Sequence, residues 1–438
     1  MQKGVVHISD HIKESVPMKG MHLFTLKNSA KDIVIIMGSI LGGHRYSPKE
    51  NRALAHLVVA MLDQGTTRKD KNAINDELES LGASIQFSSS EFRVGFTVKC
   101  RAKDIEKVLA LLYEQLRSPK FGAASFAIVQ KRMIAELLLA KEDTEKVGAI
   151  ALSQSLFPKD HPNYQCGITE LITAIRRTKV AALKEFHKNN YGLGSGILVA
   201  VGDVSHGHIE KKVSDIFSGW RKSPLELPSG PYRRKTFTRG KKERVYIPDK
   251  TSVNVLMGQS AGINNTHPDY YSLLLGVAAL GGDFCARLMM EVRERRGLTY
   301  SIYARLVGME SGVDGFWLIN GSFAPELLQK GEEAIREELS RFVEKGISAK
   351  ELRERKETII GSFEVSLEST YELAAIILNN REEGRERRFL DHFPALINGI
   401  TQKQVNRAIA RYLDTTNMVQ IAVGTIGSKR KRDSVSKN

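Results

Sequence analysis

A single histidine on a short apolar helix raises the question of what chemistry this chain could perform. We expect a helix that begins near Asn51 and includes residues 53–66, and His56 is the one histidine of residues 53–66. In the pattern His-x-x-Glu-His, two histidines four residues apart bind zinc from one helical face, and the glutamate activates water. Here the last two positions are Val59 and Ala60, which neither bind a cation nor transfer a proton. The helix therefore lacks the groups that hydrolysis needs.

Composition limits the class of protein. With 438 residues, 42% hydrophobic and 26% charged, the chain predicts a globular protein of two or more domains. Its apolar runs are far shorter than a membrane span, and residues 1–7 contain no apolar signal-peptide core. The three cysteines are well separated, which argues against disulfides and favours core positions in a reducing compartment. We expect a cytoplasmic location, or a periplasmic one if a leader was removed.

The net charge of +15 raises the question of nucleic-acid binding. The excess lies in three places: residues 233–242, residues 385–388 and residues 429–432. No interleaving of aromatic and basic residues and no zinc-finger spacing accompanies it. We interpret the charge as solvated surface and expect no nucleic-acid partner.

Internal repetition is the next signal. The strand-like run 33–38 recurs at 253–258, Tyr191 recurs at Tyr412, and the run ending in Gly202 recurs as the run ending in Gly424. The separations agree within two residues, near roughly 220 residues, as a tandem duplication predicts. We predict an N-terminal domain at 1–224, a linker at 225–245, a C-terminal domain at 246–427 and a basic, disordered tail at 428–438.

The order of elements within each half predicts the fold class. Residues 92–100 alternate as a half-buried strand, and residues 105–112 follow with helical spacing. In the second half, residues 316–319 precede a helical stretch at 326–344 that Gly346 closes. Strands followed by helices indicate an α+β fold: two homologous domains, each an antiparallel sheet with helices packed on one face.

With the duplication in view, the chain resembles the pitrilysin/insulinase family of zinc metallopeptidases over nearly its whole length, and is most similar to processing-peptidase-like members of this size. The segments 157–167, 186–204 and 280–301 carry the resemblance together with the defective helix. The most recognisable part reads Gly-Gly-Asp-Phe-Cys-Ala-Arg-Leu and then Arg-Glu-Arg-Arg-Gly-Leu-Thr-Tyr. The resemblance implies that the two domains form half of a clamshell, in which a peptide adds a strand to a sheet edge.

For the metal, the resemblance implies that two histidines and a downstream glutamate bind zinc. His56 and Glu136 match the first and third ligands, whereas Ala60 replaces the second and Val59 replaces the catalytic base. Two ligands fall short of the three that catalytic zinc sites use. We therefore expect no metal on this chain. As alternatives, His56 is simply a packed histidine, and Glu136 is a relic or a partner of His56.

A second pair of residues matches the family in the other half. The resemblance implies that an arginine and a tyrosine seven residues apart hold the peptide carbonyl, and Arg293 and Tyr300 have that spacing. Gly281 and Gly282 would let a backbone approach closely. The alternative is that Arg293 belongs to a charged helix end capped by Gly297, and Tyr300 opens the next strand.

These observations together predict a non-catalytic, substrate-binding subunit of a heterodimeric zinc metallopeptidase, inactive alone. Its partner would be a paralogous chain that carries the Zn2+, and its substrate an unstructured peptide. One alternative is an autonomous peptidase with an unusual metal site, although no other histidine pair has helical i, i+4 spacing. Another is a structural or peptide-binding scaffold without a proteolytic role.

Overall fold

The computed structural model describes residues 7–227, 240–310 and 312–426, which form two compact units. One unit comprises Met1–Glu136, Thr169–Ser229 and Ile360–Ala395, and the other comprises Leu137–Ile168, Gly230–Ile359 and Leu396–Asn438. Each unit therefore draws on both halves of the sequence. The predicted tail at 428–438 and most of the predicted linker at 225–245 lie outside the described residues, and the sequence-based domain boundaries remain predictions.

The first unit is built on a six-stranded sheet in the order β1-β2-β6-β3-β5-β4. The strands are β1 Lys13–Met18, β2 Met21–Lys27, β3 Val34–Leu41, β4 Ser84–Ser89, β5 Arg93–Cys100 and β6 Gly196–Gly202. All neighbouring pairs are antiparallel except β2 and β6, which run parallel. β3 and β6 are buried along their whole length, so both faces of the sheet centre must be covered.

The second unit holds a five-stranded sheet in the order β7-β11-β8-β10-β9. The strands are β7 Lys242–Tyr246, β8 Val253–Ser260, β9 Thr299–Val307, β10 Phe316–Phe323 and β11 Val419–Gly424. Only β7 and β11 run parallel. β3 corresponds to β8, β6 to β11 and the parallel β2 to β7, so the structure confirms the repeat that the sequence predicts.

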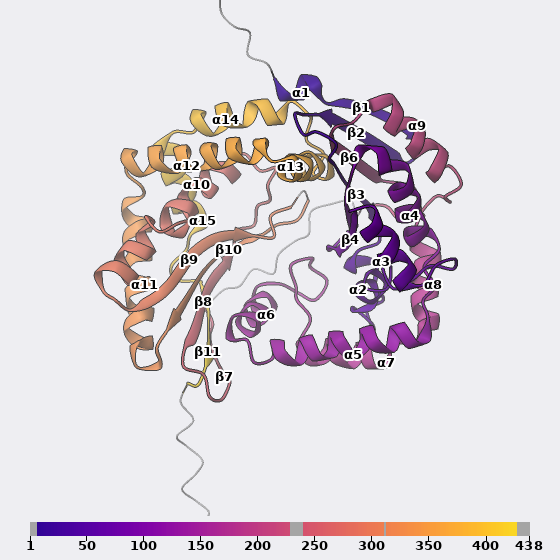
Figure 1. Cartoon of the computed structure of the whole chain (residues 1–438). Coiled ribbons are helices and arrows are strands. Elements are labelled where there is room, and N and C mark those ends of the chain that lie inside the picture. Colours follow the sequence, from indigo (N-terminus) through magenta and orange to yellow (C-terminus); the bar gives the residue numbers. More distant parts are fainter. Residues whose placement is uncertain (1–6, 228–239, 311, 427–438) are drawn as a thin grey trace, which may run out of the picture. The chain divides into compact units, whose positions relative to one another are not determined.

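The helices lie along the chain in groups between groups of strands, such as α4–α8 between β5 and β6 (Figure 1). They are α1 Ile8–His11, α2 Leu54–Val59, α3 Lys71–Ser80, α4 Ile105–Arg117, α5 Ala123–Ala140, α6 Thr144–Leu156, α7 Ile168–Arg177, α8 Val180–Asn190, α9 His206–Phe217, α10 Tyr270–Gly281, α11 Leu328–Lys345, α12 Ala349–Glu368, α13 Thr370–Glu382, α14 Phe389–Gly399 and α15 Gln402–Tyr412. Short 3-10 turns occur at His44–Tyr46, Ala102–Asp104 and Pro325–Leu327, and a π-helical turn, η3, at Met289–Arg295. None of the helices in the described ranges combines the length and apolarity that crossing a membrane requires.

The two halves of the sequence exchange helices. α13, from the second half, packs on β3 and β6, and Leu373 and Ile377 join Phe24, Met37 and Val199 in one core (Figure 1). α6, from the first half, packs on β8 and β11 of the second sheet. There Leu152 and Leu156 join Leu256, Leu318 and Ile421. Neither sheet is closed by its own half of the sequence alone.

The opposite faces carry helices as well, because side chains alternate along a strand. Thr25, between Phe24 and Leu26 of the α13 core, pairs instead with His206 Nδ1 of α9 at 2.8 Å. Trp317, between two residues of the α6 core, donates its indole N–H to the carbonyl of Tyr412 in α15 at 3.0 Å. The α+β class with two similar sheet-and-helix domains is confirmed, and the structure adds a second helical layer to each sheet.

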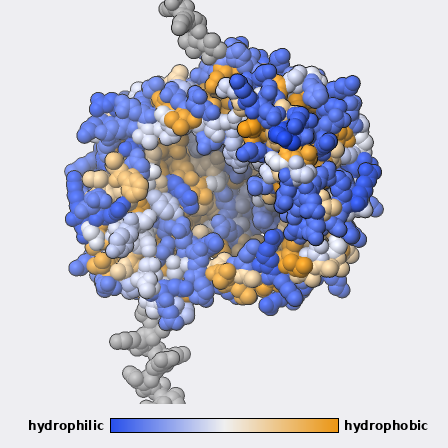
Figure 2. Space-filling view, viewed as in Figure 1, coloured by the Kyte–Doolittle hydropathy of each residue, from blue (hydrophilic) through white to orange (hydrophobic). Residues whose placement is uncertain are grey.

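Two local features differ from, or refine, the sequence predictions. The helix expected over 53–66 is only α2, Leu54–Val59, because from Ala60 onward the bonds shorten to the i→i+3 type, such as Met61 N–H to the Val58 carbonyl. On the face shown in Figure 2, hydrophilic residues predominate and hydrophobic ones form small separate groups. Most of the charged run 233–242 and all of 429–432 lie outside the described residues, so the interpretation of the excess charge as solvated stays a prediction.

The exchanged helix should carry part of the stability of the first unit. Replacement of Ile377, 3% exposed in the α13 core, by alanine is expected to lower the free energy of unfolding by about 2–5 kcal/mol. Val365→Ala, at a side chain 72% exposed on the neighbouring α12, is the control and should change it by less than about 0.5 kcal/mol. Urea denaturation followed by circular dichroism measures both.

Candidate functional site

α2 presents the defective zinc motif on a well-packed support. Leu54, Leu57 and Val58 are buried, and the Ser47 hydroxyl accepts the Ala55 N–H at 3.0 Å to fix the first turn. His56 points from the opposite, exposed side of the helix. Val59 is 8% exposed at the end of α2, and Ala60 is its C-cap. The aliphatic replacements therefore fill helix-end positions without disturbing the helix.

His56 stacks on a second histidine that the sequence analysis missed. The ring centroids of His44 and His56 lie 3.7 Å apart with planes tilted by 35°. Desolvation among the surrounding protein atoms lowers the pKa of His56, and burial with the nearby His56 ring lowers that of His44 to about 3. Within the described residues, His44 Nε2 is buried without a hydrogen-bond partner. The ring contact with His44 supports the interpretation of His56 as a packed histidine.

Glu136 lies near the C-terminal end of α5 and not in a ligand cluster. Its carboxylate is 64% exposed and pairs with Arg132, one helical turn earlier, at 3.7 Å. Its ion-pair partner is thus Arg132, at i−4 on the same helix, and the alternative in which Glu136 pairs with His56 stays a prediction. Across the parts of the chain that the structure describes, no group of three or more His, Cys, Asp or Glu side chains is placed to hold a metal ion.

A cavity of about 520 Å³ nevertheless remains at this place in the first unit. It is lined by His56, Val59, Ala60, Asp63, Ile85, Gln86, Phe87, Ser88, Ser89, Arg132, Met133 and Glu136. Five of these residues come from β4, which is the outermost strand of its sheet and pairs only with β5. The described residues thus place a cavity beside the edge strand of the first sheet, with Val59 and Ala60 in its lining.

Arg293 and Tyr300 occupy consecutive elements of the second unit. Arg293 lies in η3 and Tyr300 is the second residue of β9. Gly297, at φ +62°, closes the turn between them: its N–H bonds to the Arg293 carbonyl at 2.9 Å, and the Leu298 N–H bonds to the Val292 carbonyl at 3.0 Å. The C-cap of η3 is Arg296, one residue before the predicted Gly297, and β9 begins at Thr299, one residue before the predicted Tyr300. These bounds leave the functional interpretation open, because Tyr300 is 94% exposed.

The arginines near this turn differ in their partners. Arg295 and Arg296 both pair with Glu291, at 2.9 and 3.2 Å, and these pairs hold them against η3. Arg293 lies 3.5 Å from Glu294 and 5.6 Å from the centre of the Phe284 ring. Its side chain is about a third exposed. Of these three arginines, Arg293 is the one held against an exposed aromatic ring.

A neighbouring backbone approaches Gly281 closely, as predicted, but it belongs to β9 of this chain. A Cβ at Gly281 would lie 2.3 Å from the backbone nitrogen of Ala304. Close backbone approach is thus the reason for glycine here, but the backbone is that of β9 and not of a bound peptide. Cys285, expected in the core, is exposed, because it sits in the turn after α10, whereas Cys100 is buried.

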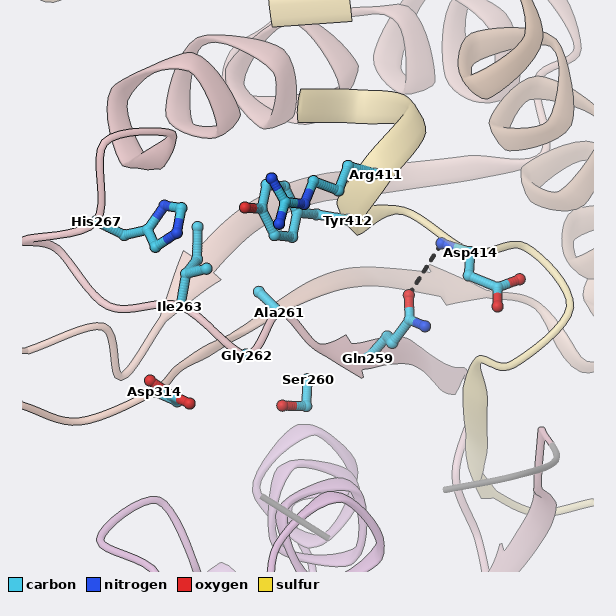
Figure 3. Close-up of a pocket in the computed structure, with 10 residues that line it drawn as sticks. All are labelled: Gln259, Ser260, Ala261, Gly262, Ile263, His267, Asp314, Arg411, Tyr412 and Asp414. Atoms are coloured by element: carbon cyan, nitrogen blue, oxygen red, sulfur yellow. Dashed lines mark hydrogen bonds between the residues drawn. The ribbon is translucent and has the colours of Figure 1, made fainter. Parts of the chain in front are cut away.

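A second cavity, of about 570 Å³, lies at the end of β8 (Figure 3). Figure 3 shows His267, Arg411 and Tyr412 on one side of the segment that follows β8, and Asp314 and Ser260 on the other. Arg411 and Tyr412 both bind the Asp269 carboxylate, at 3.4 and 2.7 Å, and burial with that bond raises the pKa of Tyr412 to about 12. Arg411 and Tyr412 of this cavity are therefore bonded to Asp269 rather than directed at a ligand.

The repeated sheet-and-helix domain defines a two-domain α+β protein. The model described as "Insulinase (Peptidase family M16)" matches residues 23–158, and the model described as "Peptidase M16 inactive domain" matches residues 179–359. The chain belongs to the insulinase family, peptidase family M16.

Known relatives span most of the chain. The protein named "Non-peptidase homolog YmxG" of Helicobacter pylori is 26% identical over 73% of this chain and 72% of its own length. An "Uncharacterized zinc protease YmxG" of Bacillus subtilis is 22% identical over 95% of this chain and 99% of its own. A solved structure from Pseudomonas fluorescens, described as a peptidase M16 inactive domain, has a TM-score of 0.86 and 23% identity, covers 96% of this chain and 99% of its own, and shows the same fold.

The histidine pair predicts a pH effect on stability. Because the folded-state pKa of His44, about 3, lies below its unfolded value near 6.5, the unfolded chain binds the proton first as the pH falls. Folding stability should therefore drop as the pH decreases below about 6.5. His44→Phe is expected to reduce the drop between pH 7 and pH 5, by on the order of 1 kcal/mol for this partly buried group.

Urea midpoints at the two pH values measure that difference. His22→Gln, at an exposed position, controls for the loss of a histidine as such. An unchanged difference between pH 7 and pH 5 in His44→Phe would show that His44 accepts a proton in the folded state as readily as in the unfolded chain.

Proposed function

We propose that this chain is the non-catalytic, substrate-binding subunit of a two-chain zinc metallopeptidase. The observation that carries the proposal is an asymmetry. The zinc position holds Val59 and Ala60, whereas the matching arginine and tyrosine of the second half are present and exposed to different degrees. The partner would be a paralogous chain that carries Zn2+, and the substrate an unstructured peptide.

The residues of the first unit support the inactive part of the proposal. A catalytic zinc needs three protein ligands and a base for its water. His56 stacks on His44, and Glu136 pairs with Arg132. No carboxylate stands at position 59. A chain of this kind would not hydrolyse a peptide bond alone.

Peptide binding is supported by the strand edge. β4 borders the cavity and presents an outer edge that pairs with no other strand of its sheet. An extended peptide could add there by main-chain hydrogen bonds, with its side chains alternating toward and away from the cavity. We propose this edge as the binding position of the unstructured peptide.

Arg293 and Tyr300 would act on the substrate carbonyl. A guanidinium fork and a phenolic hydroxyl donate hydrogen bonds to an oxygen that becomes negative in the transition state. In the proposed complex this carbonyl is polarised by the zinc of the partner chain. The three free cysteines support a reducing compartment, and we place the complex in the cytoplasm.

A second candidate is a peptide-binding scaffold without any proteolytic role. It is favoured by the name of the Helicobacter pylori relative, which describes a non-peptidase homologue. The two candidates differ in one respect: only the subunit needs Arg293 and Tyr300 for the turnover of a partner.

The test is a reconstituted cleavage assay with a paralogous chain that has an intact His-x-x-Glu-His motif. Arg293→Ala and Tyr300→Phe are each expected to lower kcat by roughly 10²–10³-fold, because each removes a donor to the developing oxyanion. Cleavage of a fluorogenic unstructured peptide measures the effect.

Matched controls separate this role from loss of charge or of a hydroxyl. Arg295→Ala removes a neighbouring, 70% exposed arginine that pairs with Glu291, and Tyr246→Phe removes an exposed hydroxyl of the same unit. Both should keep full activity. Zinc-dependent cleavage by this chain alone would contradict the proposal. If the partner's turnover is unchanged in Arg293→Ala and Tyr300→Phe, the scaffold function is supported instead.

A further inference from the structure

The segment that precedes η3 is held on both sides by buried or half-buried ion pairs. Asp283 accepts from Arg355 of α12, and its other oxygen accepts the Cys285 N–H at 2.9 Å. Arg355 is only 6% exposed. Four residues after Asp283, Arg287 binds Glu351 at 2.9 Å and the Gly346 carbonyl at 2.7 Å. Backbone motion between these two clamps is therefore restricted.

The ion pair between Arg287 and Glu351 is electrostatically strong. Burial would raise the pKa of Glu351, but its bonds with Arg287 and with Ser348 outweigh burial and lower it to about 2. Charge-assisted bonds of this kind are shorter and stronger than neutral ones. The pair remains ionised at neutral pH, so the turn is fixed under the conditions in which the protein would bind a ligand.

The fixed turn presents a large aromatic residue to solvent. Phe284 is 72% exposed although its neighbour Ala286 is 2% exposed. A phenylalanine in a flexible loop would lose both side-chain and backbone conformational entropy on binding a ligand. In a loop that ion pairs already fix, the backbone entropy has been lost before binding. Rigid exposed aromatics are typical of residues that dominate binding energy.

Phe284 is also joined to the family-type arginine. The Arg293 guanidinium lies 5.6 Å from the centre of the Phe284 ring, within cation–π range. The ring and the arginine thus form one surface, which we call the Phe284–Arg293 surface and define as Phe284 and Arg293.

The charge of this surface limits what it can bind. Phe284 offers apolar contact, and Arg293 adds a positive charge beside Glu294, which lies 3.5 Å away. A lysine or arginine of a ligand would meet a like charge here, and an apolar side chain would not.

We infer that Phe284 is a specificity-determining residue of this chain: the Phe284–Arg293 surface receives an apolar side chain of the bound peptide and rejects a basic one. The inference rests on the proposed function, since it concerns the same peptide that Arg293 and Tyr300 would hold. In this role Phe284 contacts the substrate side chain and also positions the Arg293 fork through its ring.

Direct binding of peptides to the full-length chain tests the inference without any partner. The probes are fluorescein-labelled unstructured peptides that are identical except for a central Leu or Lys, and fluorescence anisotropy gives Kd. The Leu peptide is expected to bind roughly tenfold more tightly than the Lys peptide. Phe284→Ala should weaken the Leu peptide roughly tenfold and largely remove the preference.

Two variants distinguish the ring from general effects on the fold. Phe284→Trp keeps an apolar ring and a cation–π partner, and should retain affinity within about twofold. Tyr246→Ala removes an exposed aromatic of the same unit, 52% exposed on β7, and should leave Kd unchanged. Unchanged urea midpoints of the variants would exclude unfolding as the cause of lost affinity.

The exposed thiol next to Phe284 provides an independent readout. Cys285 is exposed, so N-ethylmaleimide should alkylate it, and the bound Leu peptide should slow that reaction several-fold. Peptide mapping by mass spectrometry gives the rate at Cys285 separately from the other two cysteines. The Phe284→Ala variant should lose this protection.

Several outcomes would overturn the inference: equal Kd for the Leu and Lys peptides, an unchanged Kd in Phe284→Ala, no protection of Cys285, or no saturable binding of any probe. The proposed function fails on a different result, namely partner turnover that is independent of Arg293 and Tyr300. A chain that binds the Leu peptide through Phe284 but does not support a partner would keep the inference and refute the subunit role.

Discussion

Burial of both faces of each central sheet is the constraint on which the rest of the structure depends. β3, β6 and β11 are buried along their full length, and a strand of this kind cannot be left with one face in water. In each unit the second face is closed by a helix from the other half of the sequence: α13 for the first sheet and α6 for the second. The tandem copies therefore complete each other's cores and form one interdependent fold.

That constraint explains how the zinc chemistry could be lost without loss of the fold. The stability of the first unit lies in the core that joins its sheet to α13, and α2 is held by its own buried leucines and by Ser47. Val59 adds buried apolar area where a glutamate would have faced the metal. His56 keeps a packing partner in His44. Nothing in this arrangement needs a metal to hold the backbone in place.

The sequence predicted those parts of the fold that depend on local periodicity. The runs that became β3, β8, β5 and α4 alternate or repeat with the correct period, and the Gly297 turn follows from the left-handed conformation that glycine adopts at a helix end. The exchange of α6 and α13 could not be predicted, because amphipathic spacing shows that a helix buries one face and not which sheet receives it.

The candidate site was predictable to a similar degree. The absence of ligands at 59 and 60 is visible in the sequence, and the Arg132–Glu136 pair has i, i+4 spacing that could have been recognised. The stacking of His44 on His56 had no such signal, since a turn and a loop separate the two residues. The exposure of Cys285 and Phe284 also required the structure, because it depends on where Arg355 and Glu351 anchor the turn.

The two candidate regions differ in how tightly their side chains are held, and this difference bears on function. At the zinc position the remaining groups have local partners: Glu136 is a solvated surface carboxylate and His56 a stacked ring. At the Arg293 turn, a 6% exposed arginine and a carboxylate with a pKa of about 2 fix a segment whose outward residues are solvent-exposed. Buried ion pairs add little net stability to a fold, since desolvation opposes their attraction. Their value here is positional, because they fix the backbone of the turn that carries Phe284.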